Sequence, residues 1–501
     1  MNKEKTNNII HIAIMLLGTA FILSGSFYNA YWFDETYSIG LINHSLWELI
    51  CIAPHDVHPH LYYIMLKFYT TIFGNSAYAM RIFSAIATIG LSLIGFTHIR
   101  KDFGKKVGMY YSAVIFLFPV VFKYSQQIRM YTWAAFFVGL LAIYSYRYVL
   151  NPTKKNMVFF IIFSLCSSYT HHFAFFTAVF VNIFMFVYYL RKKEIKKRWL
   201  IPFIIQLGLF IPGLVVFCIQ GLRGGAGWIK LGKDIFFKLF AFFYVGDAIE
   251  NAVELSKLQY VLLTLFGISV FDFIVFVLYR EYCKKENKEA IWPIMSIFVF
   301  LAVIISTLIV SLIAPILYER YLFVMLPLFA FSLAYALAKV KIKPIPIGIV
   351  ATMFVVLVLR VMPIYDVTLN RSSNYVKDYT MENIDENDLL LFDESSITAY
   401  AFAVYTPNTT CCAYNKSSWG VAKAYRAFAK ESYVATDISE IENLIKEGKE
   451  TIFVFAGSKN DLINEINDSI EKSGMYEFVR KDHIYQQYYI YSFDIYVYNL
   501  K

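Results

Sequence analysis

Two adjacent carboxylates, Asp34 and Glu35, stand in an aromatic stretch that follows the first apolar run of the chain. The stretch reads YWFDET from residue 31. A carboxylate close to a membrane surface can act as a general base that takes a proton from a hydroxyl group. The structural alternative is an interfacial loop, in which a belt of aromatic side chains is followed by two solvated acids. Both interpretations are open from these residues alone.

The densest polar cluster of the sequence reads HDVHPH from residue 55 to residue 60. Its three imidazoles and one carboxylate could bind a metal ion or relay a proton, although the spacing matches no standard zinc motif. Alternatively, the cluster is the start of a helix, with Asp56 near the cap and Pro59 in the first turn. The two interpretations are compatible, because a helix start can also present His58 to a substrate.

A further set of polar side chains lies at the ends of later apolar runs. Its members are Arg81, Arg129, Tyr131, His171, Arg320 and Tyr321. Each one alone could be an interfacial anchor whose polar tip reaches water. Together they lie at the ends of their runs that face the same side, and the fork of an arginine side chain suits phosphate. The set therefore fits an anionic, lipid-linked substrate.

Apolar helices must position these side chains, since 58% of the 501 residues are hydrophobic and only 17% are charged. Soluble domains carry about 25% charged residues. A run of about 20 apolar residues crosses a hydrocarbon core of about 30 Å as a helix. We predict about eleven such spans. They lie near residues 9–27, 78–99, 106–122, 129–150, 156–171, 173–190, 199–219, 258–279, 290–314, 320–338 and 344–363.

Loop charges predict the orientation of these spans. The Lys- and Arg-bearing connections are those at residues 100–106, 154–155, 191–198, 280–288 and 339–343. With an odd number of spans they share a side with Lys3 and Lys5, and the positive-inside rule assigns that side, with the N-terminus, to the cytoplasm. Longer segments near residues 27–77, 220–257 and 365–501 then face outward. The same clusters account for the net charge of +9 without a nucleic-acid-binding groove.

The three outer segments differ in pattern. The first outer loop, residues 28–77, is predicted to contain interfacial helices over residues 44–51 and 60–73. Gly221, Gly224, Gly225 and Gly227 predict a flexible or tight turn in the second.

The composition changes near Tyr365, where acidic residues and strand-like runs begin. Strand patterns occur at residues 389–392 and 451–455, a helical pattern at 438–447, and paired strands at 485–498. We predict a transmembrane domain over residues 1–364 and an extracytoplasmic α/β domain over residues 365–501. The predicted fold class is an α-helical polytopic membrane protein that carries this C-terminal domain.

The order of these motifs resembles the GT-C glycosyltransferases of the protein mannosyltransferase-like type. That family includes the dolichyl-phosphate-mannose-protein mannosyltransferases, and the aminoarabinose transferases of lipid A are close to it. The matching pieces are Asp34-Glu35 after the first span; DVHPHLYY from Asp56, where His60 replaces a second proline; Phe73-Gly74 followed by Arg81; YSQQIRMY from Tyr124, where Gln127 stands in place of the usual acid; Thr170-His171; and Arg320-Tyr321 with Pro327. The matches spread over roughly residues 10–335, and a GT-C type fold is expected.

The resemblance implies an inverting transfer of a sugar from a polyprenyl-phosphate-linked donor to a hydroxyl acceptor on the outer face of the membrane. The acceptor could be a protein, a cell-wall polymer or a lipid. Asp34 would act as the general base, and Glu35 would orient the acceptor or His58. The three arginines of the polar set would stabilise the phosphate leaving group, and its other members, with Asp56 and His58, would bind substrate.

A donor of this kind needs no nucleotide site, and the sequence contains no Gly-rich nucleotide-binding motif. A divalent metal occurs in some relatives of the wider class, but nothing in this sequence demands a cofactor.

Two other classes of protein compete with an enzyme. A multi-span transporter or flippase of a lipid-linked or polar substrate often shows internal repeats, broken helices and polar residues near the membrane midplane. Here the polar residues lie mainly at one face, and a long outer loop precedes the second span, which favours an interfacial enzyme. The other class is a membrane-anchored binding or sensor protein whose working part is the C-terminal domain.

Overall fold

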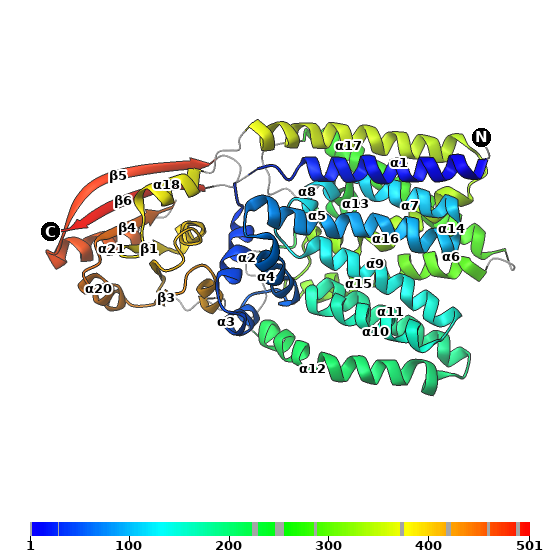
Figure 1. Ribbon diagram of the computed structural model, residues 1–501, viewed down its shortest axis with the longest axis horizontal. Coiled ribbons are helices and arrows are strands. Elements are labelled where there is room, and N and C mark those ends of the chain that lie inside the picture. The colour runs from blue at the N-terminus through cyan, green and yellow to red at the C-terminus, as the bar shows by residue number, and fades with distance from the viewer. Residues whose placement is uncertain are drawn as a thin grey trace. The chain divides into compact units, whose positions relative to one another are not determined.

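The computed structural model describes residues 3–28, 30–222, 229–245, 255–284, 288–370, 375–416, 422–457, 461–486 and 491–501. The chain divides into two compact units, each built from two separate stretches of sequence. We call them the helical unit (Met1–Phe27 and Phe73–Asn370) and the α/β unit (Tyr28–Ile72 and Arg371–Lys501). Figure 1 shows the elements of both.

The helical unit is a bundle of long apolar helices joined mostly by short connections (Figure 1). Its elements are α1 (Lys3–Ser24), α5 (Ala77–Ile94), η2 (Gly95–Ile99), α6 (Arg100–Phe103), α7 (Lys105–Leu117), α8 (Pro119–Ser125), α9 (Tyr131–Leu150), α10 (Lys154–Thr170), α11 (His172–Arg191), η3 (Lys196–Leu200), α12 (Ile201–Leu222), α13 (Ile235–Val245), α14 (Lys257–Tyr282), η5 (Lys288–Ala290), α15 (Ile291–Ser311), η6 (Glu319–Met325), α16 (Leu326–Lys339) and α17 (Pro344–Asn370). Each predicted span corresponds to one helix or one interrupted helix of this unit.

Within the described ranges, nine helices are long and apolar enough to cross a membrane. A tenth candidate is the pair α7 and α8, which is bent by 69° at its break. Pro119 begins α8, because proline has no N–H with which to continue α7. The structure thus supports nine or ten spans where the sequence predicted about eleven. The difference is α10, which has only 17 residues.

The Lys- and Arg-rich connections meet at one end of the helix bundle, where side chains link them in pairs. These pairs are Asn8–Arg100, Ala338–Lys106, Asp102–Arg147, Pro152–Arg198 and Lys339–Arg280. The arrangement within the unit therefore agrees with the alternation of loop charges. The assignment of this end to the cytoplasm stays a prediction.

The second outer segment contains a short apolar helix, α13, which the sequence analysis did not predict. Gly221, expected in a turn, belongs to the last turn of α12. The other three glycines of that prediction, Gly224, Gly225 and Gly227, lie outside the described residues.

The first outer loop folds as helices of the α/β unit. They are α2 (Phe33–Asn43), α3 (Leu46–Ile52), η1 (Ala53–His55) and α4 (Leu61–Phe73). The helices predicted over residues 44–51 and 60–73 are confirmed, whereas α2 was not predicted. The prediction that Pro59 lies in the first turn was wrong, because α4 begins at Leu61 and the carbonyl of His60 accepts its first helical hydrogen bond. Apolar side chains such as Trp47, Phe68 and Ile72 remain exposed, as expected of interfacial helices.

The C-terminal part of the α/β unit contains a six-stranded mixed sheet in the order β3-β2-β1-β4-β6-β5. Its elements are α18 (Tyr375–Asn383), β1 (Leu389–Asp393), η7 (Glu394–Ala399), α19 (Tyr400–Ala403), β2 (Thr410–Tyr414), η8 (Ala422–Ala427), β3 (Ser432–Ala435), α20 (Ile438–Lys446), β4 (Thr451–Ala456), α21 (Asp461–Ser473), β5 (Tyr476–Gln486) and β6 (Tyr491–Leu500). Strands β1 to β4 are parallel, and β6 pairs antiparallel with both β4 and β5. The predicted α/β composition and the paired C-terminal strands are confirmed.

Side chains from both faces of this sheet are buried. On one face, α20 and α21 pack Ile441, Ile445 and Ile466 against alternate residues of β1, β2 and β4. On the opposite face, Phe392 of β1 lies edge-on to Tyr400 of α19, with ring centroids 4.0 Å apart. Tyr400 in turn stacks on Phe428, which follows η8. Parallel strands need both faces covered, and α19 and η8 contribute to the cover of this second face.

Candidate active site

Asp34 and Glu35 lie in the first turn of α2, yet their surroundings differ. The backbone N–H of Trp32 donates to Glu35 Oε2 at 2.9 Å, so Glu35 reaches back and caps the start of the helix. Its side chain is buried, with 1% of its surface exposed. Asp34 is partly exposed. Of the two acids, Asp34 is therefore better placed to meet a substrate, and Glu35 has a structural role that the sequence analysis did not assign.

We expect Glu35→Gln and Glu35→Ala to differ. Glutamine keeps a side-chain oxygen that can accept from the Trp32 N–H, whereas alanine removes the cap at a cost of about 1 kcal/mol. Thermal unfolding of the purified protein should show a loss for the alanine variant that the glutamine variant largely avoids. If sugar transfer fell equally in both variants, the carboxylate charge of Glu35, and not its capping contact, would be required.

Asp56 and His58 lie in the connection between η1 and α4, in the same unit as Asp34. The Tyr63 hydroxyl donates to Asp56 Oδ2 at 3.4 Å, and the Tyr63 ring lies edge-on to Tyr37 with centroids 5.8 Å apart. Tyr37 follows Asp34 by one turn of α2. A pair of tyrosines, which the sequence analysis did not single out, thus links Asp56 to helix α2. His58, two residues after Asp56, is buried.

In the helical unit, α5 holds the turn between α8 and α9 through three polar side chains spaced along the helix. Arg81 Nη1 donates to the carbonyl of Gln126 at 2.5 Å, and the Ser84 hydroxyl donates to the carbonyl of Gln127 at 2.6 Å. One turn further along, the hydroxyls of Thr88 and Ser125 are 2.7 Å apart. Arg81 is completely buried. At least part of its guanidinium therefore fixes the backbone that leads to Arg129.

The same end of the bundle gathers three more residues of the predicted set around His171. The His171 ring lies 5.7 Å from Tyr131 and 5.0 Å from Tyr321, measured between centroids. His171 Nδ1 accepts from the N–H of Phe173 and caps α11, so the neutral ring carries its proton on Nε2. Arg129 lies close enough for an electrostatic interaction with His171.

The remaining member of the predicted set, Arg320, belongs to η6, which continues into the deeply buried helix α16. Its guanidinium lies over the ring of Tyr318 at 4.7 Å, as in a cation–π contact. Arg129 and Arg320 are both buried. Each comes from a segment that also contributes a tyrosine to the surroundings of His171, and guanidinium groups attract and hydrogen-bond anions.

Gln126 is a positioning residue that the sequence analysis missed. Its Oε1 accepts from the Ser26 hydroxyl at 2.9 Å, and its Nε2 donates to the carbonyl of Ile22 at 2.8 Å. These bonds tie the end of α1 to the turn that precedes Arg129. The signal available in the sequence was the position of Gln126 inside the YSQQIRMY stretch.

We expect Gln126→Leu to lower the free energy of unfolding by about 1–3 kcal/mol, because it leaves buried partners without their hydrogen bonds. Gln127→Leu is the matched control. It makes the same chemical change one residue away, where Oε1 is buried and has no hydrogen-bond partner in the described parts of the chain. Denaturation of the two purified variants in one detergent measures the difference. Equal losses would show that the contacts to Ser26 and Ile22 contribute nothing specific.

The predicted site residues thus fall into two groups, each within one unit. The α/β unit contains Asp34, Glu35, Asp56 and His58, and the helical unit contains Arg81, Arg129, Tyr131, His171, Arg320 and Tyr321. Among the residues that the structure describes, no group of three or more His, Cys, Asp or Glu side chains could hold a metal ion. Burial lowers the pKa of His60, which favours the neutral imidazole in the HDVHPH stretch.

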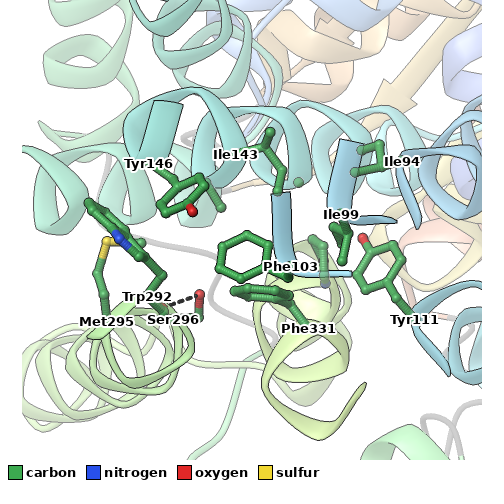
Figure 2. Close-up of a pocket in the computed structure, with 13 residues that line it drawn as sticks. Ile94, Ile99, Phe103, Tyr111, Ile143, Tyr146, Trp292, Met295, Ser296 and Phe331 are labelled. Carbon is green, nitrogen blue, oxygen red and sulfur yellow. Dashed lines mark hydrogen bonds between the residues drawn. The ribbon is translucent and has the colours of Figure 1, made fainter. Parts of the chain in front are cut away.

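A narrow cavity in the helical unit does not contain the predicted residues (Figure 2). Tyr146, Trp292 and Phe331 contribute to its walls, and Ser296 donates to the carbonyl of Trp292. Its interior of about 10 Å³ is enough for one water molecule. The cavity is too small for a sugar, so it does not compete with the polar cluster as a substrate site.

Comparisons with known proteins give a match in structure only. No protein-family model matches the sequence, and no curated protein matches it in sequence. The crystal structure of ArnT from Cupriavidus metallidurans bound to undecaprenyl phosphate matches with a TM-score of 0.61 at 9% identity, over 98% of this chain and 97% of that one. ArnT in the apo state matches with a TM-score of 0.56 at 8% identity, over the same shares of the two chains.

The chain is therefore a polytopic membrane protein with the GT-C fold and a C-terminal α/β domain, as in ArnT, an aminoarabinose transferase. The predicted fold class and the resemblance to GT-C glycosyltransferases are confirmed at the level of the fold. An identity of 9% transfers no residue roles, so the chemistry must be argued from the side chains of this chain.

Proposed function

We propose that this protein is a membrane glycosyltransferase that moves a sugar from a polyprenyl-phosphate-linked donor to a hydroxyl acceptor. The observation that carries the proposal is the match along nearly the whole chain to ArnT, whose crystal structure contains undecaprenyl phosphate. Support from this chain comes from the buried Arg129 and Arg320 at one end of the helical unit, where a phosphate group would find charge-assisted hydrogen bonds. The acceptor is a protein, a cell-wall polymer or a lipid.

Asp34 is the proposed general base. Its carboxylate takes the proton from the acceptor hydroxyl as the acceptor oxygen attacks the anomeric carbon of the sugar. The bond between that carbon and the phosphate oxygen breaks, and its electron pair leaves with the phosphate. A single displacement of this kind inverts the configuration at the anomeric carbon. The partly exposed position of Asp34 on a capped helix supports the role, because a base must be accessible and held in place.

The leaving group is a polyprenyl phosphate, whose charge grows as the bond breaks. Arg129 and Arg320 are the proposed groups that stabilise this charge. Arg81 was predicted to share this role. Its donation to the Gln126 carbonyl supports an indirect contribution, through the turn that carries Arg129. Tyr131, His171 and Tyr321, which pack around one another, are proposed to line the binding site for the donor.

We propose that the reaction takes place on the outer face of the cell membrane, with the N-terminus in the cytoplasm and the C-terminal domain outside. The support is that the basic connections gather at one end of the bundle. Along the chain they alternate with the connections that carry the predicted site residues of the helical unit, so the two sets belong to opposite ends of the helices.

A transporter or flippase is the competing function, and one experiment separates the two. Sealed vesicles that contain the protein are incubated with a polyprenyl-phosphate sugar labelled in the sugar. The proposed function predicts label on hydroxyl-bearing acceptor material and release of polyprenyl phosphate. Accumulation of intact labelled donor or sugar inside the vesicles, without transfer, would favour the transporter.

A further inference from the structure

We infer that the C-terminal part of the α/β unit positions the base, through a contact between Phe428 and the helix that carries Asp34. The inference rests on the proposed function in one respect, namely that Asp34 is the base. It gives the C-terminal domain a role that neither its fold nor the similarity to ArnT assigns. Phe428 and Gly40 are the positioning residues in this contact.

Helix α2 is not expected to be stable in isolation. It has 11 residues, and isolated helices shorter than about 12–15 residues are marginal in water. It also contains β-branched residues and Gly40, which are poor helix formers. Yet all residues from Glu35 to Ile42 are buried. Contacts with the rest of the unit must therefore fix the helix and, with it, the direction of the Asp34 side chain.

The first contact is the packing of aromatic rings from both sides of Asp34 in the sequence. Phe33 stacks on Phe428 with ring centroids 5.3 Å apart and an angle of 17° between the rings. Tyr37, one turn later, meets the same Phe428 ring edge-on at 5.6 Å. Phe428 is itself backed by Tyr400 at 5.3 Å. The helix turn that contains Asp34 is thus held between two rings that share one partner from the C-terminal part of the chain.

The second contact brings two backbones together. A Cβ atom added at Gly40 would lie 3.0 Å from the Cα of Phe428 and closer still to the carbonyl oxygen of Ala427. Neither atom belongs to a flexible side chain, so any residue larger than glycine must push the two segments apart. The approach of α2 to residues 427 and 428 is therefore as close as the chain allows.

The end of α2 is fixed as well. The His44 ring, at the C-cap, lies close to the backbone of Arg426 and Ala427. Lys67 of α4 donates to the carbonyls of Ile42 and His44, at 2.9 Å and 2.6 Å. A cation at this place also suits the negative end of the helix dipole. The aromatic contact, the close approach at Gly40 and the position of His44, spread along the helix, therefore all involve the segment that ends at Phe428.

A displacement of about 1 Å at a catalytic group can lower a rate by about 100-fold. The contact predicts that Phe428→Ala lowers kcat by about 10- to 100-fold, with a much smaller change in KM for the donor, whose proposed ligands belong to the helical unit. Gly40→Ala is the sharper variant. Alanine is the better helix former, so a helix held by its own propensity would be as active or more active. The inferred contact predicts instead that kcat falls.

Ile466→Ala is the control, because Ile466 is buried in the core on the opposite face of the sheet. It weakens the same unit without touching α2, and its kcat should stay near the wild-type value. The double variant of Gly40 and Phe428 should lose less than the product of the two single losses, since both changes break one contact. Wild-type kcat in both single variants, or an equal loss in Ile466→Ala, would overturn the inference.

Hydrogen exchange of the full-length protein gives a readout that needs no activity. Phe428→Ala should speed amide exchange over residues 33–43, and Ile466→Ala should not. Unchanged exchange in α2 would overturn the inference even if the protein transfers sugar. Faster exchange in a protein that transfers no sugar would contradict the proposed function and leave the contact itself supported.

Discussion

Asp34→Asn should lower the rate of sugar transfer by about 100- to 10,000-fold, the range expected when a general base is removed. The amide has nearly the same shape as the carboxylate and can still accept hydrogen bonds at the start of α2, so the fold should be unaffected. It cannot take a proton from the acceptor hydroxyl. Binding of undecaprenyl phosphate should be unchanged, because the proposed phosphate ligands lie in the helical unit.

The matched control is Glu48→Gln, in the same outer segment. Glu48 caps α3 by accepting from the Ser45 N–H at 2.8 Å, a contact that glutamine can keep. Both variants remove one negative charge from residues 28–72, and only the Asp34 variant removes the proposed base. Initial rates with a labelled donor measure the difference. Asp34→Asn protein that transfers sugar at the wild-type rate would contradict the assignment of the base.

Arg129→Gln should lower kcat by about 100- to 1,000-fold, because it removes one of the groups proposed to stabilise the leaving phosphate. Arg129→Lys should recover only part of the loss, since an ammonium group lacks the planar fork that binds two phosphate oxygens. Arg320→Gln should behave in the same way. Rates measured over a range of donor concentrations separate kcat from KM, and binding of undecaprenyl phosphate alone should also weaken.

Lys154→Gln provides the charge control for the arginine variants. Lys154 is exposed and begins α10 at the end of the bundle where the basic connections meet. Lys154→Gln removes one positive charge from the end of the helices opposite to that of Arg129. It should change the rate of sugar transfer by no more than a few-fold. If Arg129→Gln and Lys154→Gln had similar effects, the role of Arg129 would reduce to general electrostatics.

The sequence was informative wherever a property repeats locally. Apolar runs located the helices of the bundle, and loop charges predicted which connections share an end, because lipid imposes both patterns on neighbouring residues. The interruption at Phe118-Pro119 and the short α10 changed the span count, since neither breaks the apolar pattern enough to be noticed. Strands β1 and β4 were found for the same reason, as short apolar runs bounded by polar residues.

The missing parts depend on contacts between distant residues. Helix α2 was not predicted, because its 11 residues carry almost no amphipathic pattern and the Phe428 ring on which Phe33 stacks is nearly 400 positions away. Separations of 25 and 104 residues likewise hid the cap that Lys67 provides and the tie between Gln126 and α1. Asp34 and Glu35 were identified as a pair by their types, but only the hydrogen bond to Trp32 separated a capping acid from a partly exposed one.

The central claim, sugar transfer from a polyprenyl-phosphate donor, is tested most directly with purified protein in lipid nanodiscs, which have no interior into which a substrate could be transported. Wild-type protein and Asp34→Asn protein are each given a polyprenyl-phosphate sugar labelled in the sugar, together with membrane and cell-wall material as acceptor. We expect label on the acceptor and free polyprenyl phosphate with the wild type, and neither above background with the variant. Donor that stays intact with the wild type, while the same protein moves it across the membrane of sealed vesicles, would contradict the account.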